Sequence, residues 1–236
     1  MASFQENIDK SSVLNRKMIV ELRFKPIPTF LDKKGKILSE MEGFIPNGFW
    51  SFGELAVKIS DNNVENLVRT SLAVEINRFA YVSTKIDSIQ KYVDDIDSMY
   101  KALVQVFPNI EIARIGCRIQ GTYKTASRKF DDVVEKFKNH FPNDLFFDGY
   151  QLKDLRLEIR HGQGMYILGP VNANDSFLER NFNYEGRNNG VGIGLDTDNF
   201  LVETSLNELN SIEKIHDVVR ASLSVEKSLV DNFGAL

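Results

Sequence analysis

Four arginines are spaced so that they could bind an anion in pairs: Arg114, Arg118, Arg156 and Arg160. The first two are four residues apart, and so are the last two, in segments whose apolar residues alternate. Because side chains alternate between the faces of a strand, each pair is expected on one face, opposite the apolar positions. Paired guanidinium groups on a sheet can hold a carboxylate or phosphate. The alternative is cross-strand ion pairing with acidic residues, for which the candidates are Glu75, Glu111 and Glu158.

A second candidate is a metal site at Asp196 and Asp198, which are two residues apart in an expected strand and so share a face. With Glu158 or Glu203 nearby, these carboxylates could bind Mg²⁺, as in two-carboxylate nucleases. The alternative places both on the solvent face near a turn. A PD-(D/E)xK nuclease would have lysine where Glu158-Ile-Arg160 has arginine, which argues against that class.

The histidine with the most enzyme-like setting is His161, in Arg160-His-Gly-Gln-Gly164. Its neighbouring glycines would let the backbone approach a ligand. The alternative is that His161 only ends a hairpin. The single cysteine, Cys117, lies on an expected buried strand and reads as a core residue. One cysteine excludes an internal disulfide and a cysteine-based zinc cluster.

Other signatures of catalysis or cofactor binding are missing from the sequence. It contains no G-x-x-x-x-G-K-[ST] loop and no G-x-S-x-G elbow. The segment Gly190-Val-Gly-Ile-Gly194 leads into a strand-like run, whereas a phosphate loop leads into a helix. No cofactor is therefore predicted.

Charge and hydropathy limit the classes of partner. Lys and Arg number 29 and Asp and Glu 33, giving a net charge of -4 and a pI near 5.5. Nucleic acid is not favoured, because its binding usually requires a basic footprint. No apolar stretch approaches the ~18 residues of a membrane span, and the first residues contain no apolar signal region. We expect a cytoplasmic protein with no membrane partner.

Hydrophobic periodicity predicts an α+β protein with antiparallel sheets and helices packed on one face. We expect a loose N-terminal arm over 1–16, a first half over 17–109 and a second half over 110–236. Expected strands cover 17–25, 54–60, 71–84, 110–123, 155–160, 165–168 and 190–202. Expected helices cover 89–107, 127–141 and 205–230. Residues 32–35 and 46–48 read as turns, residues 36–53 otherwise fit no single element, and 181–189 reads as a polar loop.

The two halves invite the hypothesis of an internal duplication. The run Val74–Val82 aligns with Ile193–Leu201, and the alignment continues without a gap through the following helices, where Ile96 meets Ile215. Upstream, Met18–Lys25 corresponds loosely to Arg114–Gly121. Each half then reads strand, insert, strand, strand, helix. The alternative is that any two strand–helix units with apolar stripes align this well.

Several short motifs resemble one known family. Arg114-Ile-Gly-Cys-Arg118 resembles the RIGLRY-type strand of a sporadically distributed family of uncharacterised prokaryotic proteins, and Leu195-Asp-Thr-Asp198 resembles its LDID strand. Ile215-His216 is similar to the family's final LH pattern, and Val20–Phe24 to its first strand. Cys117, Ile119 and Thr197 depart from the family pattern. The resemblance implies no activity, and it implies a mobile-element or phage-defence neighbourhood.

Three functions remain open at this point. The lack of a complete catalytic constellation and the expected unpaired sheet edges favour a non-catalytic interaction or adaptor protein, acting in a homo- or hetero-oligomeric complex with a protein partner. The first alternative is a binding module for a small anionic ligand or nucleotide, using the four arginines. The second is a metal-dependent nuclease or hydrolase centred on Asp196 and Asp198.

Overall fold

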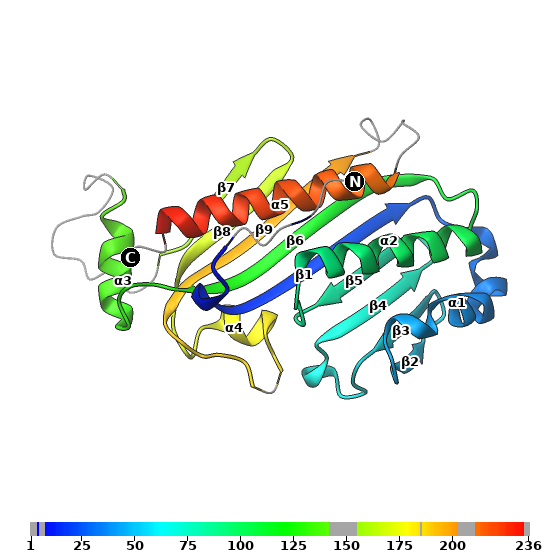
Figure 1. Ribbon diagram of the computed structural model, residues 1–236, viewed down its shortest axis with the longest axis horizontal. Coiled ribbons are helices and arrows are strands. Elements are labelled where there is room, and N and C mark those ends of the chain that lie inside the picture. Colours follow the sequence, from blue (N-terminus) through cyan, green and yellow to red (C-terminus); the bar gives the residue numbers. More distant parts are fainter. Residues whose placement is uncertain (1–3, 5–7, 142–154, 185, 203–210, 234–236) are drawn as a thin grey trace.

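The computed structural model describes residues 4, 8–141, 155–184, 186–202 and 211–233 (Figure 1). Within these residues, nine strands form one antiparallel sheet in the order β2-β3-β4-β5-β1-β6-β9-β8-β7. The strands are β1 (Val13–Phe24), β2 (Phe49–Phe52), β3 (Ala56–Ser60), β4 (Thr70–Glu75), β5 (Arg78–Ser83), β6 (Ile112–Lys124), β7 (Leu157–His161), β8 (Gly164–Val171) and β9 (Gly192–Val202). The helices are α1 (Lys34–Met41), α2 (Ile89–Val106), α3 (Phe130–Lys138), α4 (Ser176–Asn181) and α5 (Ser211–Phe233).

The α+β prediction is confirmed, and the two halves share a single sheet. They meet where β1 pairs with β6 at the sheet centre, with Val20 opposite Cys117. The first half runs β1, an insert containing α1 and β2, then β3, β4, β5 and α2. The second runs β6, α3, β7, β8, β9 and α5, with α4 between the last two strands. The order of elements is therefore similar in the two halves.

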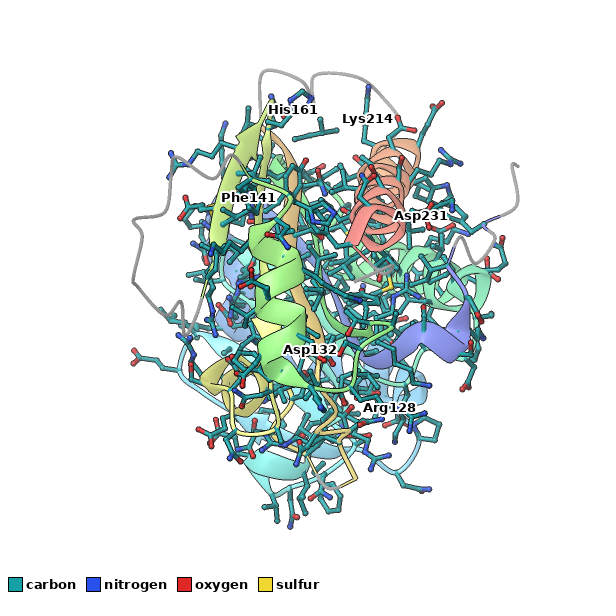
Figure 2. All side chains as sticks on the ribbon, turned by 90° about the vertical axis from the view of Figure 1, so that its left-hand side faces the viewer. Arg128, Asp132, Phe141, His161, Lys214 and Asp231 are labelled. Carbon is teal, nitrogen blue, oxygen red and sulfur yellow. The ribbon has the colours of Figure 1, made fainter. Side chains whose placement is uncertain are left out.

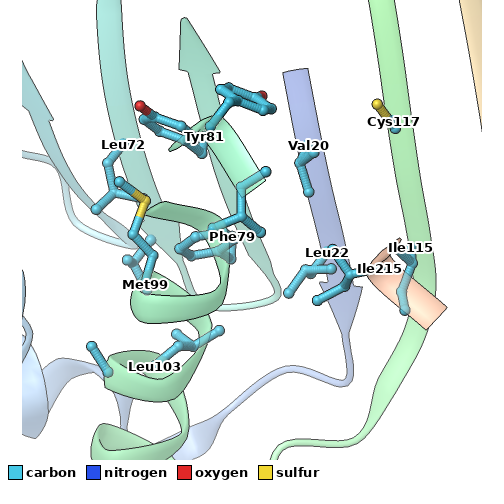
Figure 3. Close-up of a cluster of buried hydrophobic side chains, with 14 of the residues drawn as sticks. Val20, Leu22, Leu72, Phe79, Tyr81, Met99, Leu103, Ile115, Cys117 and Ile215 are labelled. Atoms are coloured by element: carbon cyan, nitrogen blue, oxygen red, sulfur yellow. The ribbon is translucent and has the colours of Figure 1, made fainter. Parts of the chain in front are cut away.

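One face of the sheet is covered by helices. Ser88 caps α2 by accepting a hydrogen bond from the Lys91 amide at 3.0 Å, and apolar side chains along α2 face the sheet. Figure 3 shows Met99 and Leu103 of α2 beside the strand residues, and Ile215 of α5 near Ile115. These side chains are almost completely buried in one cluster that spans both halves. The fold therefore depends on this shared core.

The opposite face is covered only in part. Phe177 of α4 packs against Gly194 of β9, so that α4 covers one end of this face. Towards β3, β4 and β5 the face is left open. We call this side of the sheet the open face.

Three predicted segments differ from the structure. The N-terminal arm is shorter than expected because β1 begins at Val13, and Asn15 and Arg16 are buried. The expected strand over 71–84 is the hairpin β4–β5, whose turn at Ile76 and Asn77 contains neither glycine nor proline. The expected turn over 32–35 is helical, since α1 starts at Lys34 and continues into the ambiguous region.

Other boundaries move by a few residues. The helix expected over 127–141 spans Phe130–Lys138. A further short helix, α4, ends at Asn181, where only a polar loop was expected. The start expected for the last helix, at Ser205, lies outside the described residues, and the described helix extends to Phe233.

The gap-free alignment of the halves fails in the strands and fits in the helices. Val82 pairs with Ile19 on the open face, whereas its expected counterpart Leu201 pairs with Ile115 on the helix-covered face. The alignment therefore exchanges the two faces. In the helices, Ile96 and Ile215 are both buried.

Candidate functional site

The open face contains a groove of about 680 Å³. It lies over the strands from β3 to β6 and includes Asp198 of β9. Its charged lining consists of five cationic and three acidic side chains: Arg23, Lys58, Arg78, Arg114, Arg118, Glu21, Glu75 and Asp198. The cationic excess contrasts with the chain's net charge of -4.

Small residues make room for the groove. Gly116, Ala80 and Ala73 line it, and they lie in one cross-strand row with Glu21 between Gly116 and Ala80. Such short side chains leave space above the sheet that larger ones would fill. Lys58 ends this row, opposite Ala73, and the arginines stand in the rows on either side of it. The result is a shallow floor surrounded by groups that can donate or accept hydrogen bonds.

Three arginines lie directly opposite one another in the sheet. The strand registers pair Arg23 with Arg78 on one side and with Arg114 on the other. Neighbouring strands are about 4.8 Å apart, so the three positions form a line across β6, β1 and β5. Like charges in directly opposed positions destabilise a sheet. This arginine row, Arg114–Arg23–Arg78, is therefore an arrangement that packing alone does not favour.

One carboxylate contacts all three members of the arginine row. Glu21 accepts hydrogen bonds from Arg23 at 2.7 Å, from Arg114 at 3.1 Å and from Arg78 at 3.4 Å. Glu75 also accepts from Arg78, and this raises the pKa of the arginine further. These carboxylates offset part of the repulsion and hold the guanidinium groups in fixed orientations.

Arg114 and Arg118 lie on one face of β6, as their spacing predicts, and both are ion-paired. Arg118 donates to both oxygens of Asp196, at 2.7 and 2.5 Å. Arg114 donates to Asp198 at 3.1 Å and lies over the Phe200 ring. The acidic partners of these two arginines are thus on β1 and β9. Of the three partners considered from the sequence, Glu158 is used, since it pairs with Arg160 at 3.3 Å along β7, whereas Glu75 and Glu111 pair with Arg78 and Lys25.

The second predicted arginine pair does not reach the groove. Arg156 precedes β7 and donates at 2.5 Å to Asp175, the residue that caps α4. The Arg160 side chain is 80% exposed and lies near Glu158 on the edge strand. His161 lies at the tip of the β7–β8 hairpin, far from Arg128 in Figure 2. The registers place Arg160 on the open face, three strands away from Arg118, because Arg160 is opposite Met165 and Met165 is opposite Asp198. None of Arg156, Arg160 and His161 is among the residues that line the groove.

The arrangement of Asp196 and Asp198 suits ion pairing better than metal binding. Asp196 is held by Arg118 and by Gln120, whose amide donates at 3.0 Å, and Asp198 is held by Arg114. In the described part of the chain, no group of three or more His, Cys, Asp or Glu residues could hold a metal ion. Arginine partners compete directly with a cation for these oxygens. The ion pairs also explain the position of both carboxylates without a metal.

Several donors of the groove are still available to a ligand. Lys58 makes no ion pair or hydrogen bond with any residue that the structure describes. Arg23 uses only Nε towards Glu21, and its side chain is 57% exposed. Arg118 donates to Asp196 through Nε and Nη2. Even when Asp196 is included, cations outnumber acids at this surface, so an added anion would find free donors.

Lys17 marks the end of the open face that α4 covers. Its ammonium group donates to the Asn181 carbonyl at 2.7 Å and lies over the Phe182 ring. The Lys17 pKa is lowered to about 8, mainly by burial and also by the Arg118 charge, while Asp196 acts in the opposite direction. The lysine is thus partly desolvated and is not freely available to a ligand.

Cys117 lies on the helix-covered side of β6 and is fully buried. Burial raises its pKa to about 12, so the thiol is not a nucleophile at neutral pH. The interpretation of Cys117 as a core residue is confirmed.

Sequence reasoning missed most of the groove. Glu21 and Arg23 alternate with apolar residues in the first strand, which placed them on its polar face. Lys58 and Arg78 carry the same signal in their strands. Alternation identifies the face, but it does not identify the neighbouring strand. The arginine row therefore becomes visible only from the registers.

We compared the chain with models of known protein families and with curated proteins, and neither comparison gave a match. Among the described helices, none combines the length and apolar character needed to span a bilayer.

Proposed function

We propose that this chain is a binding protein without a catalytic role, and that the groove of its open face binds an anionic ligand. The arginine row carries the proposal. Glu21, Glu75 and Asp198 pair with these arginines, and the groove still has five cationic side chains against three acidic ones. A ligand anion would balance this excess and accept hydrogen bonds from the guanidinium groups.

The absence of a suitable acid–base or metal arrangement in the groove supports binding over catalysis. The carboxylates that line it contact arginines, and the thiol lies on the other face. The proposal keeps the interaction role that the sequence predicts and places the interaction at the groove. The family resemblance and the mobile-element setting stay predictions.

Isothermal titration with three anionic probes tests the proposal: tripolyphosphate, citrate and a glutamate-containing peptide. We expect at least one probe to bind, with about tenfold weaker affinity in Arg118→Ala, equivalent to about 1.4 kcal/mol. Arg160→Ala is the matched control, because it removes an exposed arginine outside the groove. The proposal fails if no probe binds, or if Arg118→Ala binds as the wild type does. Circular dichroism would confirm that each variant is folded.

A second candidate function, self-association, is favoured by the contrast between the two sheet edges. The β7 edge carries Glu158 and Arg160, whereas β2 contains no charged residue or proline, and its Phe49 and Phe52 are 48% and 57% exposed. Charges and prolines are the usual protection of edge strands. We propose that β2 pairs with β2 of a second copy across a two-fold axis.

Light scattering coupled to size exclusion tests the self-association. We expect a dimer for the wild type and a monomer for Phe52→Lys. A wild-type monomer at high concentration would contradict the pairing.

We also propose that the halves descend from one unit. Their similar element order supports this, as does the hydrogen bond of 2.9 Å between Asp97 and His216, which are 119 residues apart and correspond in the helix alignment. If a pseudo-two-fold axis relates the two halves, a residue close to that axis contacts its own counterpart in the other half. In homologous sequences, the first half should then align with the second half. The strands should need an alignment one residue out of step with that of the helices.

A further inference from the structure

The donors still available in the groove are dispersed. Arg23 is on β1, Arg118 is on β6 at a position two rows away along the strands, and Lys58 is on β3, beyond β5 and β4. At about 3.4 Å per residue along a strand and about 4.8 Å between strands, the three positions are separated by roughly 14–20 Å. A compact anion can contact only one of them at a time. A ligand that uses all three must be extended and carry several separated charges.

Acidic groups stand between these donors. Glu21, Glu75 and Asp198 line the same groove, and Glu21 lies within the small-residue floor. A chain with dense charge, such as a polyphosphate, would be repelled at these points. A peptide alternates carboxylates with backbone N–H groups, and the N–H groups can donate to the resident carboxylates. The mixed charge pattern therefore complements a peptide better than a phosphate chain.

The rest of the lining agrees with this choice. Ile19, Val82 and Ala80 supply a small apolar strip, and Ser51 and Ser71 supply hydroxyl groups. No aromatic side chain is among the residues that line the groove, so bases would have no stacking surface. The low floor leaves space for a backbone to approach the sheet.

We infer that the ligand of the groove is an extended acidic segment of a partner protein, with carboxylates on alternate residues. This inference rests on the proposed function, since it names the class of anion that the same groove binds. Arg23, Arg118 and Lys58 would each bind a different carboxylate of the segment. The resident acids would accept its backbone N–H groups.

Fluorescence anisotropy with a labelled peptide of alternating glutamate and alanine tests the inference. Its matched probe has glutamine in place of every glutamate, and tripolyphosphate is the third probe. We expect the glutamate peptide to bind at least tenfold more tightly than the glutamine peptide. Lys58→Ala and Arg23→Ala should each weaken it about fivefold, and Arg160→Ala should leave it unchanged.

The outcomes separate the two proposals. If tripolyphosphate binds and the glutamate peptide does not, the groove binds anions but the peptide inference is wrong. Equal affinities for the glutamate and glutamine peptides would also overturn it. If no probe binds, both proposals fail. Lys58 forms no ion pair with the described residues, so Lys58→Ala tests the groove without disturbing the network that orients the arginines.

Discussion

Two arginine–glutamate clusters lie on strand β1, on opposite faces of the sheet. On the helix-covered face, Arg16 donates to Glu226 of α5, and the Tyr123 hydroxyl donates to the same carboxylate. Glu226 is fully buried, and Arg16 is 8% exposed. On the open face, Glu21 contacts three arginines, of which Arg23 is 57% exposed.

The two clusters show how burial changes the contribution of an arginine–glutamate ion pair to stability. The buried cluster has been removed from water, so each charge depends on its partner. The open cluster is only partly buried, since Arg23 and Arg78 are 57% and 40% exposed while Glu21 is 17% exposed. Its ion pairs therefore contribute less to folding and can exchange for a ligand. The first cluster therefore joins α5 to the sheet, and the second is suited to binding.

The largest effect is expected at the buried carboxylate. Glu226→Gln removes a buried charge that both Arg16 and the Tyr123 hydroxyl contact, and it should lower the free energy of unfolding by about 3–5 kcal/mol. Urea denaturation followed by circular dichroism measures this change. The control is Asp231→Asn on the same helix, whose surface ion pair with Lys227 should be worth less than about 1 kcal/mol. Equal effects in the two variants would contradict the comparison.

An intermediate case is Lys17, which lies beside Arg16 but faces the other side of the sheet. Its pKa is about 8 in the folded protein, because burial disfavours the charged form, and about 10.4 in an unfolded chain. Between these values the unfolded state binds more protons, so this lysine makes stability rise with pH. The slope is at most about 1.4 kcal/mol per pH unit.

Comparison with Lys17→Met isolates this effect. The unfolding free energy of the wild type minus that of Lys17→Met should increase from pH 8 to pH 10. Other groups that titrate in this range, such as Cys117 in the unfolded chain, are common to both proteins and cancel. A constant difference across this range would show that Lys17 is not desolvated.

A smaller effect is expected from the hydroxyl group of the buried cluster. Tyr123→Phe removes one donor to Glu226 while the ring stays packed, and should lower the unfolding free energy by about 1–2 kcal/mol. The urea midpoint should therefore fall between those of wild type and Glu226→Gln. A loss as large as that of Glu226→Gln would mean that the Tyr123 hydroxyl contributes as much to the cluster as the Glu226 charge does.

The sequence indicates the two faces of β1 correctly, because Met18, Val20 and Leu22 alternate with polar residues. It does not indicate which strands flank β1. The β4–β5 hairpin illustrates the limit: a turn of isoleucine and asparagine carries no glycine or proline, so two strands were read as one. Without that hairpin, Arg78 cannot be placed beside Arg23.

The candidate site was therefore predictable in part. Arg114 and Arg118 were assigned to one polar face, and this is confirmed. Their partners Glu21, Asp196 and Asp198 come from strands distant in sequence, and the choice depends on registers that the whole sheet determines. Arg156 and Arg160 carry a similar local pattern, but β7 is an edge strand and leaves them away from the groove. Local spacing cannot distinguish a central strand from an edge.

The smallest effect on stability, and the sharpest test of the comparison, is expected from Glu21→Gln. Its arginine partners are partly exposed and the glutamine keeps their hydrogen bonds, so the unfolding free energy should change by less than about 1 kcal/mol. The glutamine can still accept hydrogen bonds from the arginines while losing the charge that repels an anion. Affinity for the glutamate peptide should therefore rise about threefold, as measured by anisotropy. Weaker binding would mean that the Glu21 charge is needed to hold the arginines in place, and loss of folding would show that the open cluster stabilises the fold as the buried one does.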